Sequence, residues 1–168
     1  MGLFNTDYYL IIDPMMSLTL IERPASDSVI IGNLRKMGYK ATSQRIAICR
    51  LVLSSREHPT AQRIYRDVKR VHPTVSLATV YKTLQVLKGL RLIQELPLPQ
   101  SETRFDSNVS PHLNAVCLQC GGVTDVRDQS LSNIVSRAAS KTKFRVTGHR
   151  FDLYGVCDKC AGRRGVTT

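Results

Sequence analysis

Two short stretches with the same spacing, Cys117-Leu-Gln-Cys120 and Cys157-Asp-Lys-Cys160, contain four of the five cysteines in the chain. In each stretch two residues separate the thiols, so two sulfurs of one turn can bind the same ion at about 2.3 Å. Two such turns complete a tetrahedron, and a closed four-thiolate site holds zinc for structure because no position stays open to a substrate. The spacing therefore predicts a structural zinc on these four cysteines.

Two other interpretations of the cysteine pairs are open. Two disulfides would need an oxidising compartment, and a redox-active Cys-x-x-Cys would need only one of the pairs. The sequence has no apolar run near the ~20 residues of a spanning helix and no basic leader before Tyr8-Tyr9-Leu10, so a cytoplasmic protein with reduced thiols is predicted. The 36 residues between the pairs, 121–156, exceed a zinc-ribbon gap, so folded structure is expected between them.

Charge is unevenly distributed along the 168 residues, whose formal net charge is +11. Residues 28–99 contain 13 basic and 3 acidic side chains, whereas residues 1–27 contain one basic and four acidic side chains. A concentrated basic segment favours a polyanionic partner, most simply nucleic acid. Residues 1–27 are interpreted as an N-terminal extension, either disordered or packed on the body as a helix or strand.

The basic segment predicts several short helices followed by a hairpin. Apolar residues recur at helical spacing in 28–37, from Thr42 onward, in 61–72 and in 77–88. Thr42, Thr60 and Ser76 are the expected N-caps, and Gly38, Pro73 and Gly89 the expected ends. Inward positions include Cys49, expected as a small core residue, and Ile64, Val68 and Val71. Strands are predicted at 90–96 and 103–105.

This order of elements is that of a winged helix-turn-helix domain, here placed at 28–103. Residues 76–88 would then be the recognition helix, whose outward side chains are small, polar or basic. We expect contacts with duplex DNA from Thr79, Tyr81, Lys82 and Gln85. The other interpretation of these residues is an ordinary solvated helix face.

Residues 104–168 predict a smaller second domain. Strands are expected at 113–118 and 123–126, a helix at 131–139, and one or two strands across 144–156 with a break at Gly148. Zinc on the cysteines would tie the strand ends of this domain together. The predicted fold class is therefore α+β, with an N-terminal winged helix-turn-helix domain and a small C-terminal α/β domain.

These residues together resemble the ferric-uptake-regulator (Fur) family of dimeric, metal-dependent repressors, from about residue 29 to 160 in unbroken order. The matching motifs are Thr42-Ser-Gln-Arg45, His58-Pro-Thr-Ala-Gln-Arg-Ile-Tyr65, Ser76-Leu-Ala-Thr-Val-Tyr81, Arg104-Phe-Asp106, His112, Cys117-x-x-Cys-Gly121 and Tyr154-Gly-Val-Cys-x-x-Cys160. The resemblance implies that residues 104–168 form a dimerisation domain, and that a homodimer binds a palindromic double-stranded operator.

The resemblance also implies a regulatory metal, Fe²⁺ or Mn²⁺, on His58, Asp106, His112 and Asp125. An aspartate at position 125 is similar to the peroxide-sensing (PerR) branch of the family. One position departs from the motif, since Asn114 stands where a second histidine is expected. An amide oxygen binds iron or zinc more weakly than imidazole but suits a harder ion such as manganese, so Asn114 is a weak ligand in this interpretation. His149 aligns with a further family metal site whose other ligands are largely missing, and is interpreted as structural.

The leading hypothesis is a peroxide-responsive, metal-dependent DNA-binding repressor. One alternative in the same family is a sensor of iron, zinc or manganese concentration. From other classes, the chain could be a zinc-stabilised RNA-binding module or a small metalloenzyme. An enzyme is not predicted, because the cysteine site is closed and Gly-x-Ser-x-Gly, His-Glu-x-x-His and phosphate-loop motifs are missing from the sequence.

Overall fold

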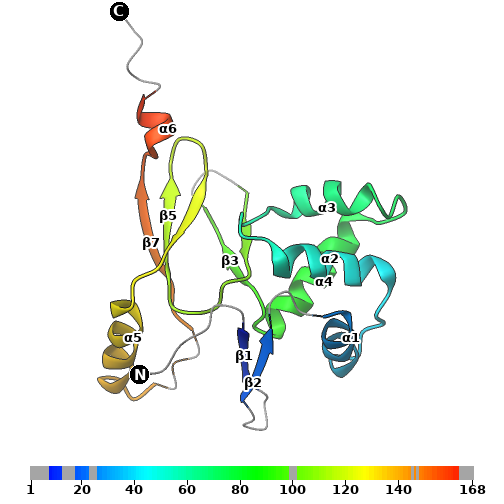
Figure 1. Cartoon of the computed structure of the whole chain (residues 1–168), viewed down its shortest axis with the longest axis horizontal. Helices are drawn as coiled ribbons and strands as arrows, with labels where there is room; N and C mark the ends of the chain where they lie inside the picture. Colours follow the sequence, from blue (N-terminus) through cyan, green and yellow to red (C-terminus); the bar gives the residue numbers. More distant parts are fainter. Residues whose placement is uncertain are drawn as a thin grey trace, which may run out of the picture. The chain divides into compact units, whose positions relative to one another are not determined.

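The computed structural model describes residues 8–12, 18–22, 26–98, 102–144, 146 and 148–162. The described residues fall into two compact units, the first ending with Glu102–Val109 and the second beginning at Ser110. Among these residues no helix combines the length and apolar character needed to span a membrane. The elements, most of which are labelled in Figure 1, are β1 (Tyr8–Ile12), β2 (Leu18–Glu22), α1 (Asp27–Lys36), α2 (Ser43–Ser54), α3 (Ala61–Lys69), α4 (Leu77–Gly89), β3 (Gln94–Leu96), β4 (Arg104–Asp106), β5 (Leu113–Cys117), β6 (Val123–Val126), α5 (Ser130–Ser140), β7 (Phe151–Gly155) and α6 (Asp158–Ala161).

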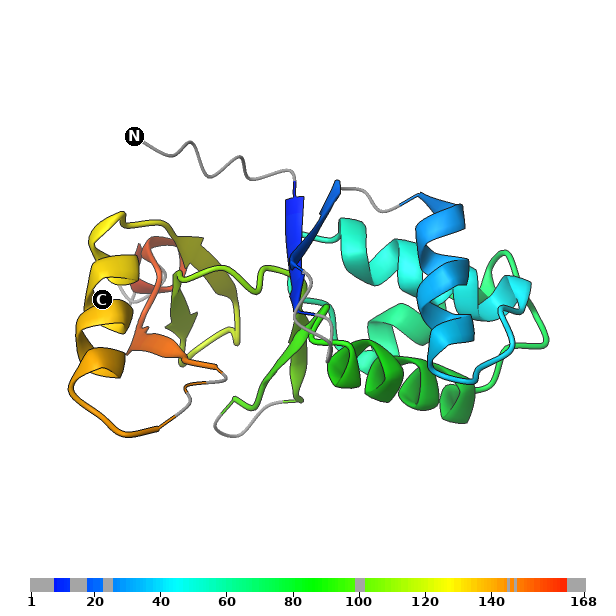
Figure 2. The same ribbon diagram turned by 90° about the horizontal axis from the view of Figure 1, so that it is seen from below.

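The described part of the N-terminal extension forms a β-hairpin rather than a helix. Strands β1 and β2 pair antiparallel, with Tyr8 opposite Glu22 and Ile12 opposite Leu18. Both strands are drawn in blue in Figure 2. Of the predicted alternatives for residues 1–27, strand is therefore present at 8–12 and 18–22. Ser26 and Asp27 belong to the start of α1, and the other residues of the extension lie outside the described ones.

The helices of the first unit begin at the residues that the sequence predicts as caps. The side-chain oxygens of Thr42, Thr60 and Ser76 accept hydrogen bonds from backbone amides three residues later, at 3.4, 3.2 and 3.1 Å. Each bond satisfies an amide that has no partner within the helix. Gly38 follows α1 with φ of +74°, a conformation that glycine adopts without strain. The three N-caps and this stop are confirmed.

One apolar core holds the first unit together. It includes Ile48 and Cys49 of α2, Ile64 of α3, and Val80 and Leu84 of α4, each no more than 1% exposed. Burial raises the pKa of the Cys49 thiol to about 12, so this cysteine is the unreactive core residue that the sequence predicts. The prediction for Val71 is wrong: α3 ends at Lys69 instead of His72, and the Val71 side chain is 75% exposed.

The wing is shorter than predicted. Strands β3 and β4 pair antiparallel, with Glu95 opposite Phe105. The predicted first strand began at Leu90, but the chain still turns there, because the amide of Leu92 donates to the carbonyl of Leu87 and Arg91 has φ of +56°. Apolar periodicity could not separate this helix end from a strand, since Leu92 and Ile93 are buried in the core either way.

The second unit is a three-stranded mixed sheet with strand order β6-β5-β7. Strand β5 pairs antiparallel with β6 and parallel with β7, and helix α5 connects β6 to β7 (Figures 1 and 2). The strands predicted at 113–118 and 123–126 and the helix at 131–139 are confirmed. The strand predicted across 144–156 is present only as Phe151–Gly155; residues 145 and 147 lie outside the described residues.

Candidate functional site

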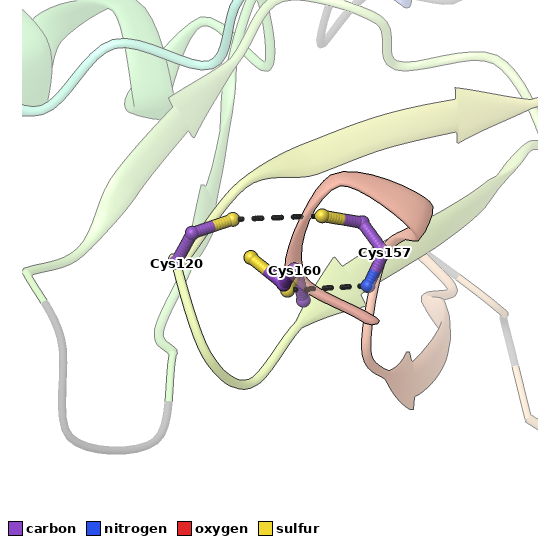
Figure 3. Close-up of side chains that lie close together, drawn as sticks. Cys120, Cys157 and Cys160 are labelled. Carbon is purple, nitrogen blue, oxygen red and sulfur yellow. Dashed lines mark hydrogen bonds between the residues drawn. The ribbon is translucent and has the colours of Figure 1, made fainter. Parts of the chain in front are cut away.

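The four paired cysteines meet at one end of the sheet in the second unit. Cys117 ends β5, Cys120 lies on the turn that follows, and Cys157 and Cys160 lie at the start and within α6. Their four sulfurs all lie within 4.8 Å of one another. The sulfurs of Cys120 and Cys157 are 3.9 Å apart, and Figure 3 shows the two side chains turned toward each other. The sequence prediction that these residues share one site agrees with this cluster.

Backbone hydrogen bonds set the turn that presents Cys117 and Cys120. The amide of Gly121 donates to the Cys117 carbonyl at 2.9 Å, and the Cys117 amide donates to the Gly122 carbonyl at 2.8 Å. Gly121 has φ of +65°, and a Cβ on Gly122 would lie 3.3 Å from the Cys120 sulfur. Two glycines after the second cysteine therefore let the chain bend closely around the sulfurs.

The thiols are electrostatically poised for a cation. Hydrogen bonds from the backbone amides of Cys157 and Cys120 lower the pKa of the Cys117 thiol to about 6. The neighbouring Cys157 sulfur and burial raise the pKa of Cys160 to about 12. The amide donors thus favour the thiolate form of Cys117, whereas the neighbouring sulfurs and burial favour the protonated form of Cys160. A Zn²⁺ ion stabilises all four thiolates together, and the donor set of four sulfurs fits zinc.

In the first unit, His58 lies beside Asp106. Its loop is held on β4 by two bonds: Arg104 Nη1 donates to the His58 carbonyl at 3.1 Å, and the Phe105 amide donates to the Pro59 carbonyl at 3.0 Å. His58 itself has φ of +47°, an uncommon value for a non-glycine residue. These constraints put His58 Nε2 3.5 Å from Asp106 Oδ1, and both side chains are buried.

In the second unit, His112 lies between Asn114 and Asp125. His112 Nδ1 donates to the Ser110 carbonyl at 2.8 Å, so in the neutral ring Nε2 holds the lone pair. That Nε2 lies 3.3 Å from Asn114 Oδ1 and 3.8 Å from Asp125 Oδ1. With the neutral ring in this tautomer, all three atoms can bind a cation. Two oxygens and one imidazole nitrogen suit Mn²⁺ or Fe²⁺.

Sequence reasoning missed Asp152, which lies directly beside Asn114 on the neighbouring strand β7. Asn114 Nδ2 donates to Asp152 Oδ1 at 3.3 Å. Strand register alone brings these two residues together across a gap of 38 positions, and no spacing motif marks such a pair. His149, interpreted as structural, packs its ring on Phe151 with centroids 5.7 Å apart, and burial and the nearby His112 lower its pKa.

The predicted recognition helix α4 has an exposed polar face. Tyr81, Lys82 and Gln85 are exposed, while Thr79 is half-buried with its hydroxyl 2.9 Å from that of Ser76 at the helix start. Gln85 Nε2 donates to Glu95 of the wing at 3.4 Å, and Lys88 forms an ion pair with the same carboxylate. Tyr81 and Lys82 thus project outward from this face. At the C-terminal end of α4, Gln85 and Lys88 contact Glu95 of the wing.

Three comparisons with known proteins give the same assignment. The model of the ferric uptake regulator family matches residues 36–154. The chain is 41% identical over 130 residues to the peroxide-responsive repressor PerR of Staphylococcus aureus, covering 77% of this chain and 88% of that protein. The solved Campylobacter jejuni peroxide stress regulator matches at a TM-score of 0.65 and 31% identity, over 78% of this chain and 98% of that one.

A more distant structure agrees in fold. The Helicobacter pylori ferric uptake regulator Fur matches at a TM-score of 0.69 and 20% identity, over 84% of this chain and 97% of that one. The α+β fold, with a winged helix in the first unit and an α/β sheet in the second, is that of these structures. The chain therefore belongs to the ferric uptake regulator family.

Proposed function

We propose that this chain is a metal-dependent, DNA-binding transcriptional repressor that responds to peroxide. The observation that carries the proposal is its 41% identity to a peroxide-responsive repressor over most of both chains. The residues needed for such a switch are present: four clustered cysteines in one unit, and a buried histidine beside an aspartate in each unit. As a regulator of this family, the chain is not expected to be an enzyme, and it would act in the cytoplasm.

Zinc on Cys117, Cys120, Cys157 and Cys160 has a structural role in this proposal. A four-thiolate site is closed, so the ion stabilises the fold and does not react with a substrate. One cysteine pair lies at the end of β5 and on the turn that follows, and the other lies at the start of α6 and within it. The two pairs are separated by 36 residues. A zinc ion therefore links both ends of the second unit, which would be the dimerisation domain.

His58 and Asp106, together with His112, Asp125 and the weaker ligand Asn114, would hold one regulatory Fe²⁺ or Mn²⁺. Two imidazoles and two carboxylates form a mixed set that binds such ions reversibly. Since the ligands belong to two units, an ion that binds all of them favours the closed arrangement of those units over an open one. Bound ferrous iron would supply the reaction with peroxide, which oxidises a histidine and weakens the site.

The closed homodimer would bind a palindromic duplex operator. Thr79, Tyr81, Lys82 and Gln85 on α4 would enter the major groove, and the basic side chains of 28–99 would contact phosphates. A two-fold dimer places two recognition helices at half-site spacing, which a palindrome matches. The polar, outward face of α4 and its position before a two-stranded wing support this assignment.

A second candidate is a sensor of metal concentration in the same family. It is favoured by Asn114, because replacing an imidazole with an amide oxygen makes the donor set harder and removes one oxidisable ring. The two candidates differ in their response to peroxide in the iron form, but share zinc, DNA binding and metal dependence.

The proposal is tested by DNA binding of zinc-containing protein with and without added Mn²⁺ or Fe²⁺. We expect the metal to tighten binding to a palindromic duplex and to have little effect on a scrambled duplex. Equal binding to the palindrome, the scrambled duplex and single-stranded RNA, whether metal is present or not, would instead indicate a nonspecific nucleic-acid-binding module.

A further inference from the structure

We propose that Asp152 is a positioning residue that turns the carboxamide oxygen of Asn114 toward the regulatory metal. The inference rests on the proposed function, since it concerns the same ion. It assigns a role to a residue outside the ligand set and states which end of the Asn114 amide binds. The donor offered at position 114 is then oxygen rather than nitrogen.

The sheet register is the first observation. Asn114 on β5 lies opposite Asp125 on β6 and opposite Asp152 on β7. Directly opposed residues of neighbouring strands project from the same face of a sheet, so the amide lies in a row between two carboxylates. Asn114 is 1% exposed, so its polar ends depend on protein partners or an ion.

The second observation is that Asp152 is fixed. Arg150 Nε donates to Asp152 Oδ2 at 2.8 Å, and the Tyr154 hydroxyl donates to the same oxygen at 3.0 Å. The other oxygen, Oδ1, accepts from Asn114 Nδ2 at 3.3 Å, and the carboxyl side chain is only 11% exposed. Asp152 thus has a partner on each oxygen and is held in place by Arg150, just before β7, and by Tyr154 on β7.

The chemistry of the pair determines the amide orientation. An ionised carboxylate only accepts hydrogen bonds, so the NH₂ end of Asn114 must face Asp152 and the oxygen must face the other way. On that side the Asn114 oxygen is 3.3 Å from His112 Nε2, whose ring is oriented by the Ser110 carbonyl. With Asp152 in place, Asn114 presents an acceptor to the ion; with an amide at 152, either end could face the ion.

The test measures Mn²⁺ affinity of the zinc-containing, full-length dimer by competition with a chelating dye. Asp152→Asn is nearly isosteric and removes the constraint on amide orientation. We expect it to weaken Mn²⁺ binding by about 10-fold, the lower end of the range for residues that orient metal ligands. Asp128→Asn is the matched control: it makes the same charge change in the same unit, and an asparagine can still cap the amide of Ser130.

A double-mutant cycle identifies how Asp152 acts. In an Asn114→Ala background, Asp152→Asn should change Mn²⁺ affinity by less than about twofold, because the amide that it orients is gone. An equal 10-fold loss in both backgrounds would overturn the proposal, as would unchanged affinity in the single Asp152→Asn variant. One zinc per chain in each variant verifies the fold. If the unmodified protein bound no Mn²⁺ or Fe²⁺ beyond its zinc, the proposed function itself would fail.

Discussion

The two units differ in what holds them together. In the first unit, four helices enclose an apolar core that includes Leu34, Ile48, Val80 and Leu84, each at most 1% exposed. Among the described residues of the second unit, buried apolar side chains are few, and large ones are exposed on the single chain. These exposed residues are Leu118, Val126, Ile134, Phe144, Val146, Leu153, Tyr154 and Val156.

The comparison teaches that the same chain uses two sources of stability. Burial of apolar side chains in a core of four helices is the main source of stability that the first unit shows. The second unit has a small core, and domains with small cores depend on metals or association for their stability. The four clustered thiols fit stabilisation by a metal, because zinc stabilises the sheet ends. The exposed apolar surface fits stabilisation by association, because a second copy would cover those side chains.

Removing one zinc ligand should have the largest effect. Cys157→Ser is expected to lose the zinc, unfold the second unit and abolish the dimer, because the metal links β5 with α6. Zinc content by mass spectrometry and the molar mass in solution measure both effects. Cys49→Ala, in the core of the first unit, is the control and should retain one zinc per chain. A Cys157→Ser protein that stays dimeric would contradict the claim that the second unit depends on zinc for its stability.

A charge on the exposed apolar surface should have an intermediate effect. Leu153, 59% exposed on the edge strand β7, is replaced by glutamate. We expect dimer dissociation to rise at least about tenfold, since a carboxylate at an apolar interface must be desolvated. Val71→Glu makes the same change at a 75% exposed site of the first unit and should leave the dimer unchanged. Equal dissociation of both variants would show that the exposed apolar residues of the two units do not differ in role.

Lys82→Ala should have the smallest effect, confined to DNA binding. Loss of one phosphate contact lowers affinity for all sequences and makes the salt dependence shallower by about one unit of slope. Lys88, also on α4, forms an ion pair with Glu95, so Lys88→Ala should reduce the slope by less. Fluorescence anisotropy across a salt series measures both. A slope unchanged by Lys82→Ala would remove this residue from the DNA contacts.

Local chemistry made much of this fold predictable. Thr42, Thr60 and Ser76 are N-caps because their oxygens can reach an amide three residues later, which depends on sequence neighbours alone. The cysteine cluster was also predictable, since each pair lies on one turn and zinc chemistry requires two such turns. Family resemblance supplied His58, Asp106, His112 and Asp125, which share no local spacing.

The errors and omissions arise where tertiary context decides. Val71 continues the apolar period of α3, but the helix ends two residues earlier and the side chain points to solvent. Leu90 and Arg91 complete a helix end, although their sequence is equally compatible with a strand. Asp152 is adjacent to Asn114 only through the parallel register of β5 and β7, which sequence periodicity does not determine.

The central claim, peroxide sensing through the regulatory metal, is tested most directly by mapping oxygen added to the protein. Zinc-containing protein is loaded with Fe²⁺ or with Mn²⁺, treated with peroxide, and analysed by peptide mass spectrometry alongside a DNA-binding assay. We predict one added oxygen on His58 or His112 in the iron form only, with loss of DNA binding. Unmodified histidines and intact DNA binding in the iron form would contradict peroxide sensing and indicate a sensor of metal concentration.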